Sequence, residues 1–140
     1  MSYMVNAARV AEVLGVKART LSDLSHAVEK GLPKQALSRT AKRVFVERGA
    51  ARKFLVGVVP EATFKRRVRL TVPESERTER LARVIATAEY VWDDREEARQ
   101  WLNTTHPELG GRSPLQSALT ELGARRVEAL LDRILYGLPA

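Results

Sequence analysis

The chain has 140 residues, of which 44% are hydrophobic and 29% charged, with a formal net charge of +7 and no cysteine. This length can bury the core of one domain or of two small domains that share a core, and the lack of cysteine excludes disulfides, thiolate metal sites and a thiol nucleophile. The N-terminus lacks a charged segment followed by a long apolar run, and no run approaches the roughly 18 apolar residues of a membrane span, so we expect a soluble cytoplasmic protein.

The first segment, residues 1–30, predicts a short helical extension. Asn6 can cap an amphipathic helix that Gly15 ends, because an asparagine side chain accepts a hydrogen bond from the first helical turn. Thr20, with Asp23 three residues later, is a typical start of a second helix.

The next segment, residues 31–69, predicts a helix-turn-helix. Pro33 is expected at the first position of a helix that runs to the break at Gly49. In the hairpin that follows, Gly57 is expected to make a left-handed turn and Pro60 to open the second helix.

Basic residues accumulate in and around this hairpin, where they could neutralise DNA phosphates, while side chains near the start of the second helix are placed to read base edges. The candidate DNA-binding residues are Arg52, Lys53, Glu61, Thr63, Lys65, Arg66, Arg67 and Arg69. An ordinary surface helix with basic residues in its last turn remains the alternative.

The charge balance changes sign near Thr71, which forms a predicted capping box with Glu74. Residues 1–72 hold 15 Lys and Arg against 5 Asp and Glu, whereas residues 73–140 hold 9 against 12. A net charge of +10 followed by −3 suggests one surface for a polyanion and a second surface for another partner. A solvated basic face without a partner is the alternative.

The remaining chain, residues 70–140, also predicts helices, so the expected fold is all-α. A long helix with an apolar stripe follows Glu74, and Asp93 is expected to cap the next helix. Ser113 starts a short helix, and the last helix ends before Gly137.

An elbow rich in proline and glycine separates two of these helices. Proline fixes its direction, the paired glycines permit positive φ, and the tryptophan and leucine side chains are expected to pack into the core rather than bind a ligand. The predicted structural residues of the elbow are Trp101, Pro107, Leu109, Gly110, Gly111 and Pro114.

No residue set supports catalysis. His26 and His106 are far apart and lack a metal-ligand spacing, and the sequence contains no phosphate-binding glycine loop and no nucleophile elbow. The acidic run at 93–97 is typical of the first turn of a helix. We therefore predict no enzyme activity, no metal site and no cofactor.

Four ordered motifs carry a family resemblance: L-T-V-P-E-S-E-R (70–77), A-R-Q-W-L (98–102), P-E-L-G-G-R-S-P-L (107–115) and G-A-R-R-V-E-A-L-L-D-R-I-L-Y-G (123–137). The chain resembles the antitoxins of the Xre/MbcA/ParS group, which are partners of RES-domain toxins. Residues 58–68 look like the recognition segment of the family's Xre-type helix-turn-helix, although Glu61 stands at a position that is commonly polar or basic.

The resemblance implies a type II antitoxin that binds a cognate RES-domain toxin through residues 70–140, and operator DNA through the helix-turn-helix. RES toxins consume NAD or transfer ADP-ribose from it, and the antitoxin would block the toxin sterically, form a homodimer within a larger complex and repress its own operon. The inhibitory positions carried over are Arg133, Tyr136, Gly137, Leu138, Pro139 and Ala140. The alternative is a stand-alone transcription regulator or nucleoid-type DNA binder in which residues 73–140 are only a dimerisation domain. For the tail by itself, the alternative is a frayed terminus.

Overall fold

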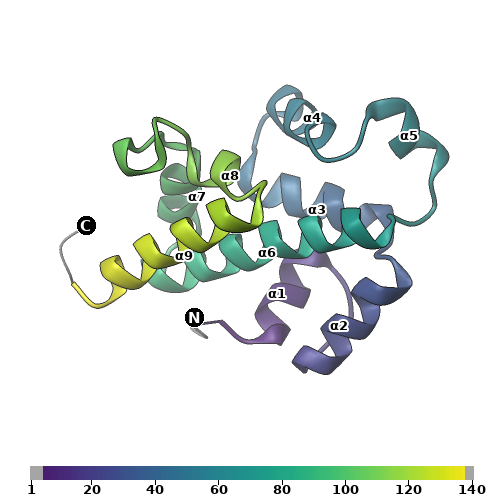
Figure 1. Ribbon diagram of the computed structural model, residues 1–140, viewed down its shortest axis with the longest axis horizontal. Coiled ribbons are helices and arrows are strands. Elements are labelled where there is room, and N and C mark those ends of the chain that lie inside the picture. Colours follow the sequence, from purple (N-terminus) through teal and green to yellow (C-terminus); the bar gives the residue numbers. More distant parts are fainter. Residues whose placement is uncertain (1–4, 138–140) are drawn as a thin grey trace.

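The computed structural model describes residues 5–137, and in this part of the chain every regular element is a helix, as predicted (Figure 1). The helices are α1 (Ala7–Leu14), α2 (Leu21–Lys30), α3 (Lys34–Val44), α4 (Arg48–Val56), α5 (Glu61–Arg66), α6 (Val72–Trp92), α7 (Arg95–Asn103), the 3-10 helix η1 (Pro107–Leu109), α8 (Pro114–Ser117) and α9 (Glu121–Leu135).

The long helix α6 lies at the centre and packs against α1, α2, α3, α7 and α9 (Figure 1). The middle of α6 is apolar on several sides. Residues so close together in a helix point in different directions, and four of them are all buried: Leu81, Ala82, Val84 and Ile85. One contiguous cluster of buried side chains extends from α1 to α9. The basic and acidic parts of the chain therefore share one hydrophobic core, which α6 supplies from its middle.

Polar caps start the helices where the sequence predicts them. The Asn6 side chain accepts a hydrogen bond from Arg9 N at 3.0 Å. Thr20 with Asp23, Thr71 with Glu74, and Ser113 with Gln116 form capping boxes in which each side chain bonds the other residue's backbone N–H. These short signals fix where the chain turns, so they set the direction in which each helix enters the core.

Five local predictions are wrong. The helix that follows Pro33 ends at Val44, and Gly49, its expected break, lies within α4. Gly57 has φ −68°, because the last turn of α4 continues through it, with Gly57 N donating to Phe54 O at 3.0 Å. Pro33 and Pro60 are N-cap residues rather than first helical residues, since both have extended ψ values near 142°. Asp93 ends α6 in a left-handed conformation, and Asp94 caps α7 in its place, accepting from Glu97 N at 2.9 Å.

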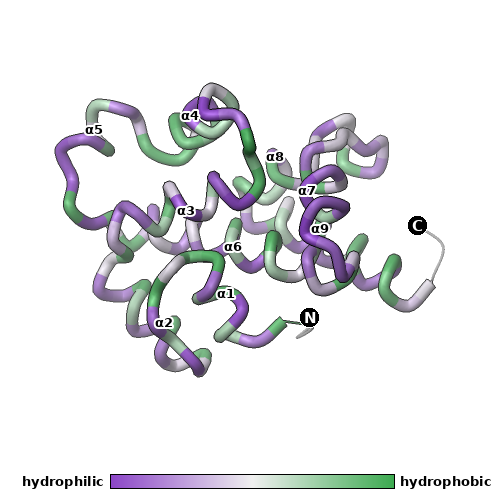
Figure 2. The backbone as a smooth tube through the Cα atoms, turned by 180° about the vertical axis from the view of Figure 1, so that it is seen from behind, coloured by the Kyte–Doolittle hydropathy of each residue, from purple (hydrophilic) through white to green (hydrophobic). Residues whose placement is uncertain are grey.

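Hydrophilic and hydrophobic residues alternate along the helices, as amphipathic helices require (Figure 2). Within residues 5–137, no helix has both the length and the apolar character needed to cross a membrane.

Candidate functional site

The first candidate surface is the hairpin formed by α4 and α5. Helix α4 packs against α3, and the rings of Phe45 and Phe54 lie 5.2 Å apart, centroid to centroid. Helix α5 has no buried residue. Its end is held to α3 by Lys34, whose Nζ donates to the carbonyl oxygens of Phe64 at 3.3 Å and Lys65 at 3.4 Å. The hairpin therefore presents much of α5 to solvent, while Thr63 and Phe64 are half-buried.

Five of the predicted DNA-binding side chains lie on this exposed surface: Arg52, Lys53, Glu61, Lys65 and Arg66. Glu61 Oε1 lies 3.7 Å from Lys65 Nζ and 4.0 Å from Arg52 Nε, so it partly neutralises the cations beside it. Thr63 is half-buried on the same helix. These residues leave a compact basic surface with one carboxylate at its centre, which we call the hairpin surface.

Arg67 and Arg69 are engaged elsewhere. The Arg67 guanidinium pairs with the carboxylate of Glu74, which also accepts from Thr71 N at 2.8 Å. Arg69 Nη1 donates to the carbonyl oxygen of Gly31 at 2.8 Å. Both arginines connect the end of α5 to neighbouring elements, an arrangement that basic spacing in the sequence does not reveal.

The second candidate surface begins at the elbow between α7 and α8. Gly110 and Gly111 have φ values of +67° and +77°, which confirms the positive φ expected of both. His106 closes the loop through its backbone: its N donates to Arg112 O, and its carbonyl oxygen accepts from Gly111 N, both at 3.0 Å. The elbow is therefore a small hydrogen-bonded ring.

Three of the other predicted elbow residues pack against the core, whereas Pro107 is exposed. Leu109 and Pro114 are buried, and Pro107 begins η1. The half-buried Trp101 lies with its ring 5.2 Å from that of His106 and 6.4 Å from that of Trp92, centroid to centroid. These contacts make the elbow a packed element.

Polar contacts from the elbow and from α6 fix the orientation of α9. Arg126 donates to the backbone carbonyl of Glu108, and Arg133 Nη2 lies 3.8 Å from the Glu108 carboxylate. On the α6 side, Arg80 Nε donates to Glu121 at 3.0 Å and Arg83 Nε to Glu128 at 3.1 Å.

A half-buried carboxyl group, that of Glu79, lies beside these α6 contacts. Burial raises the pKa of Glu79 above its ordinary value of 4.5, although Arg83 Nη1 lies 3.6 Å from its carboxylate. The interface between α6 and α9 is thus both packed and electrostatically sensitive.

One face of α9 is largely exposed, although its Arg126 and its half-buried Arg133 contact Glu108 of the elbow. Ala124, Val127, Leu130 and Leu131 are buried against the core. The opposite face carries two large exposed apolar side chains, together with small and basic residues at helical spacing. We call it the α9 outer face, and its residues are Leu122, Arg125, Arg126, Ala129, Arg133 and Tyr136.

The predicted inhibitory residues lie only in part on the described chain. Arg133 and Tyr136 belong to the α9 outer face, and Gly137 follows with φ +66°. Residues 138–140, which include the predicted Leu138, Pro139 and Ala140, lie outside the described residues. Leu122, Arg125, Arg126 and Ala129 lie on the same face and are outside the predicted set, although the seven-residue spacing of Leu122, Ala129 and Tyr136 indicates a shared helix face.

Both candidate surfaces lie within segments that match known protein families. The family profile of the antitoxin Xre-like helix-turn-helix domain matches residues 23–83, which include the hairpin surface. The profile of the antitoxin Xre/MbcA/ParS C-terminal toxin-binding domain matches residues 87–137, which include the elbow and the α9 outer face. Fold and matches thus define a helix-turn-helix protein with a C-terminal toxin-binding domain. The chain belongs to the Xre/MbcA/ParS antitoxin family.

A curated relative agrees with this assignment. The chain is 34% identical over 84 residues to the Antitoxin Xre of Pseudomonas putida strain KT2440. The aligned part is 57% of this chain and 53% of the relative, so the chain spans about half the length of that protein.

Proposed function

We propose that this chain is the antitoxin of a type II module. It binds a RES-domain toxin that consumes NAD or transfers ADP-ribose, blocks that toxin sterically, and represses its own operon by binding operator DNA, as a cytoplasmic homodimer within a toxin–antitoxin complex. In this proposal the domains are residues 1–30, 31–69 and 70–140, and the chain itself performs no catalysis.

The observation that carries the toxin-binding half is the α9 outer face. The large apolar side chains of this face are not part of the core, since Leu122 is 70% exposed and Tyr136 is 69% exposed. Interfaces favour such aromatic and apolar anchors with arginines around them. The face also lies within the segment that matches a toxin-binding domain.

The elbow supports the same role by holding this face in a fixed direction. Its ring is anchored by buried side chains, and Glu108 connects it to Arg126 and Arg133 on α9. A preformed helix face binds with a smaller entropy cost than a segment that must fold during association.

The DNA-binding half rests on the hairpin surface. Arg52, Lys53, Lys65 and Arg66 expose their side chains on a helical hairpin within the matched helix-turn-helix segment. Phosphate contacts by such side chains supply salt-dependent affinity, and residues at the start of α5 are placed for base contacts. We assign Arg67 and Arg69 to the support of this surface, because both are engaged within the protein.

Co-expression of this chain with the RES-domain protein encoded beside it, followed by size-exclusion chromatography, tests the proposal. We expect a stable complex. The double variant Leu122→Glu/Tyr136→Ala should lose the complex and still shift operator DNA, whereas the matched double variant Lys53→Glu/Lys65→Ala should keep the complex and lose the DNA shift.

The same experiment separates the rival function. If no complex forms while the chain still shifts its promoter DNA, the protein is a stand-alone regulator and residues 73–140 serve another purpose, such as dimerisation. Deletion of residues 138–140 tests the tail separately: unchanged toxin rescue would leave inhibition to the α9 outer face alone.

A further inference from the structure

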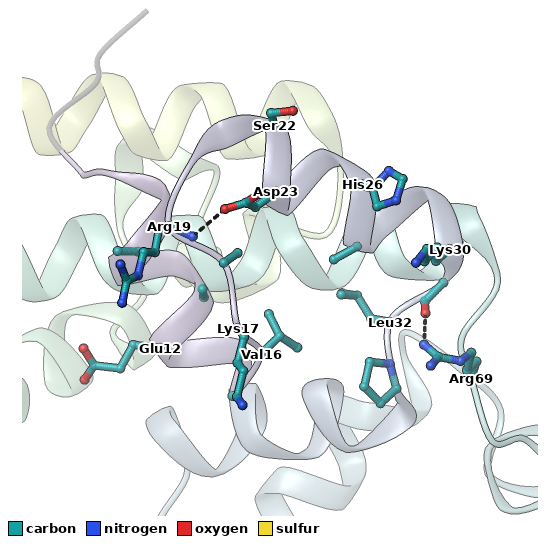
Figure 3. A pocket seen from close by; sticks show the side chains of 17 residues that line it. Glu12, Val16, Lys17, Arg19, Ser22, Asp23, His26, Lys30, Leu32 and Arg69 are labelled. Atoms are coloured by element: carbon teal, nitrogen blue, oxygen red, sulfur yellow. Dashed lines mark hydrogen bonds between the residues drawn. The ribbon is translucent and has the colours of Figure 1, made fainter.

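A groove of about 1200 Å³ lies at the N-terminal end of the molecule, and its lining includes no residue of the α9 outer face and none of the exposed residues of the hairpin surface (Figure 3). It is lined by α1, the α1–α2 connection, α2 and the α2–α3 turn, and Arg69 closes one end. Residues 8–19 contribute much of this lining and precede both segments that match family profiles. The groove is larger than the ~300–1,000 Å³ of pockets for drug-sized molecules, so it has room for a chain segment.

Part of the lining of the groove is apolar, beside polar residues such as Ser22 and His26. Val16, Ala18, Ala27 and Pro33 are half-buried there, and Leu32 is fully buried beneath them. A surface of this kind gains free energy when apolar side chains cover it. It therefore favours a ligand that brings such side chains.

The rim of the groove is basic. Lys17, Arg19 and Lys30 are exposed, and among residues 5–137 no carboxylate lies within ion-pair distance of their side chains (Figure 3). The two carboxylates that line the groove already have partners within the protein. Asp23 accepts from the backbone N of Arg19 at 3.1 Å as part of the α2 cap, and Glu12 pairs with cations outside the groove.

We propose that this groove binds a short, extended acidic peptide segment of a partner protein. The carboxylates of the segment meet Lys17, Arg19 and Lys30, and its apolar side chains cover Val16 and Ala27. A DNA duplex suits this site less well, because its charge lies on a phosphate backbone that offers no apolar side chains to the lining. The proposal does not depend on the identity of the toxin or on the hairpin surface.

The test uses the full chain and a fluorescein-labelled peptide in which pairs of glutamates alternate with single leucines. Fluorescence anisotropy should show saturable binding. The double variant Lys17→Glu/Lys30→Glu should bind at least about tenfold more weakly, because it turns two attractions into repulsions. The control Lys53→Glu/Lys65→Glu makes the same change of charge outside the groove and should bind the peptide as the wild type does.

Further probes separate the contributions. A peptide with serine in place of leucine should bind more weakly, since it cannot cover the apolar lining. Absence of saturable binding, equal binding of the serine peptide, or equal loss in both double variants would overturn the proposal. If Lys17→Glu/Lys30→Glu instead lowers the affinity for operator DNA and leaves the peptide unaffected, the two lysines serve DNA. Circular dichroism of each variant verifies that it is folded.

Discussion

At the residue scale, one buried hydrogen bond connects the turn before α3 to the start of α6. The backbone N–H of Leu32 donates to Ser75 Oγ at 2.8 Å, and both residues are fully buried. The sequence does not predict this hydrogen bond, because the two residues lie 43 positions apart and nothing in the sequence around Ser75 indicates that its side chain is buried. The bond shows why α2 and α3 keep their place on α6.

Replacing Ser75 with alanine should lower the free energy of unfolding by about 1–3 kcal/mol, because the Leu32 N–H then stays buried without an acceptor. Urea denaturation followed by circular dichroism measures this loss. Ser25→Ala, at an exposed position of α2, is the control and should change stability by less than about 0.5 kcal/mol. Equal effects of both variants would contradict the account.

Gly123 is the residue that lets α9 approach α8. A Cβ atom at this position would lie 1.8 Å from the carbonyl oxygen of Ser117. Gly123→Ala should therefore destabilise the protein by about 1–3 kcal/mol, although alanine favours helices. Gly49→Ala in α4, where the new Cβ would be 3.4 Å from Glu47 Oε1, should raise the thermal midpoint. A rise for both variants would show that α9 does not need the close approach.

At the element scale, α6 is the support on which both candidate surfaces depend. It contacts α3, which holds the hairpin, and α9, which carries the outer face. The apolar periodicity of the sequence predicted this long helix, and the predicted capping box at Thr71 fixed its start. The sequence could not show that α6 is buried on several sides, because that depends on which helices return to it from distant parts of the chain.

The carboxyl group of Glu79 makes the contact between α6 and α9 sensitive to pH. Burial raises its pKa above 4.5 in the folded chain, so the folded state holds a proton that the unfolded state has already lost. Stability should therefore fall as pH rises through this raised pKa. Glu79→Gln stays uncharged, so its stability relative to wild type should increase over the same interval.

Urea unfolding of both proteins at a series of pH values measures this difference. The series starts at about pH 4, near the ordinary pKa of a carboxyl group, and continues upward. Glu76→Gln, at an exposed position of α6, controls for the removal of one carboxylate from the helix. A stability difference between Glu79→Gln and wild type that does not vary with pH would contradict the assigned role of burial.

At the scale of the whole molecule, the two candidate surfaces lie on different elements around one core. The sequence predicted the all-α fold, most helix starts and the exposed basic residues, since these follow from local patterns. It could not separate Arg66, which is exposed, from Arg67, which pairs with Glu74, because that difference arises only when α5 meets the start of α6. The seven-residue spacing of Leu122, Ala129 and Tyr136 indicates a shared helix face, but only the packing of α9 on the core shows that this face is exposed.

This difference between adjacent arginines can be measured. Arg66→Ala should weaken operator binding and reduce the log–log salt slope by about one unit, with unchanged unfolding. Arg67→Ala should instead lower the free energy of unfolding by more than about 1 kcal/mol, because it leaves the buried Glu74 carboxylate without its cation. Gel-shift titrations at several salt concentrations, with urea denaturation of the free proteins, decide between the roles. The reverse assignment of effects would contradict the structure.

The most direct measurement of the central claim is NAD consumption by the purified RES-domain protein while this chain is added in increasing amounts. We expect wild type and Arg66→Ala to suppress NAD loss stoichiometrically, and Leu122→Glu/Tyr136→Ala to leave it unsuppressed. Full suppression by the α9 variant, or loss of suppression with Arg66→Ala, would contradict a toxin-binding surface on α9 that is separate from the hairpin surface.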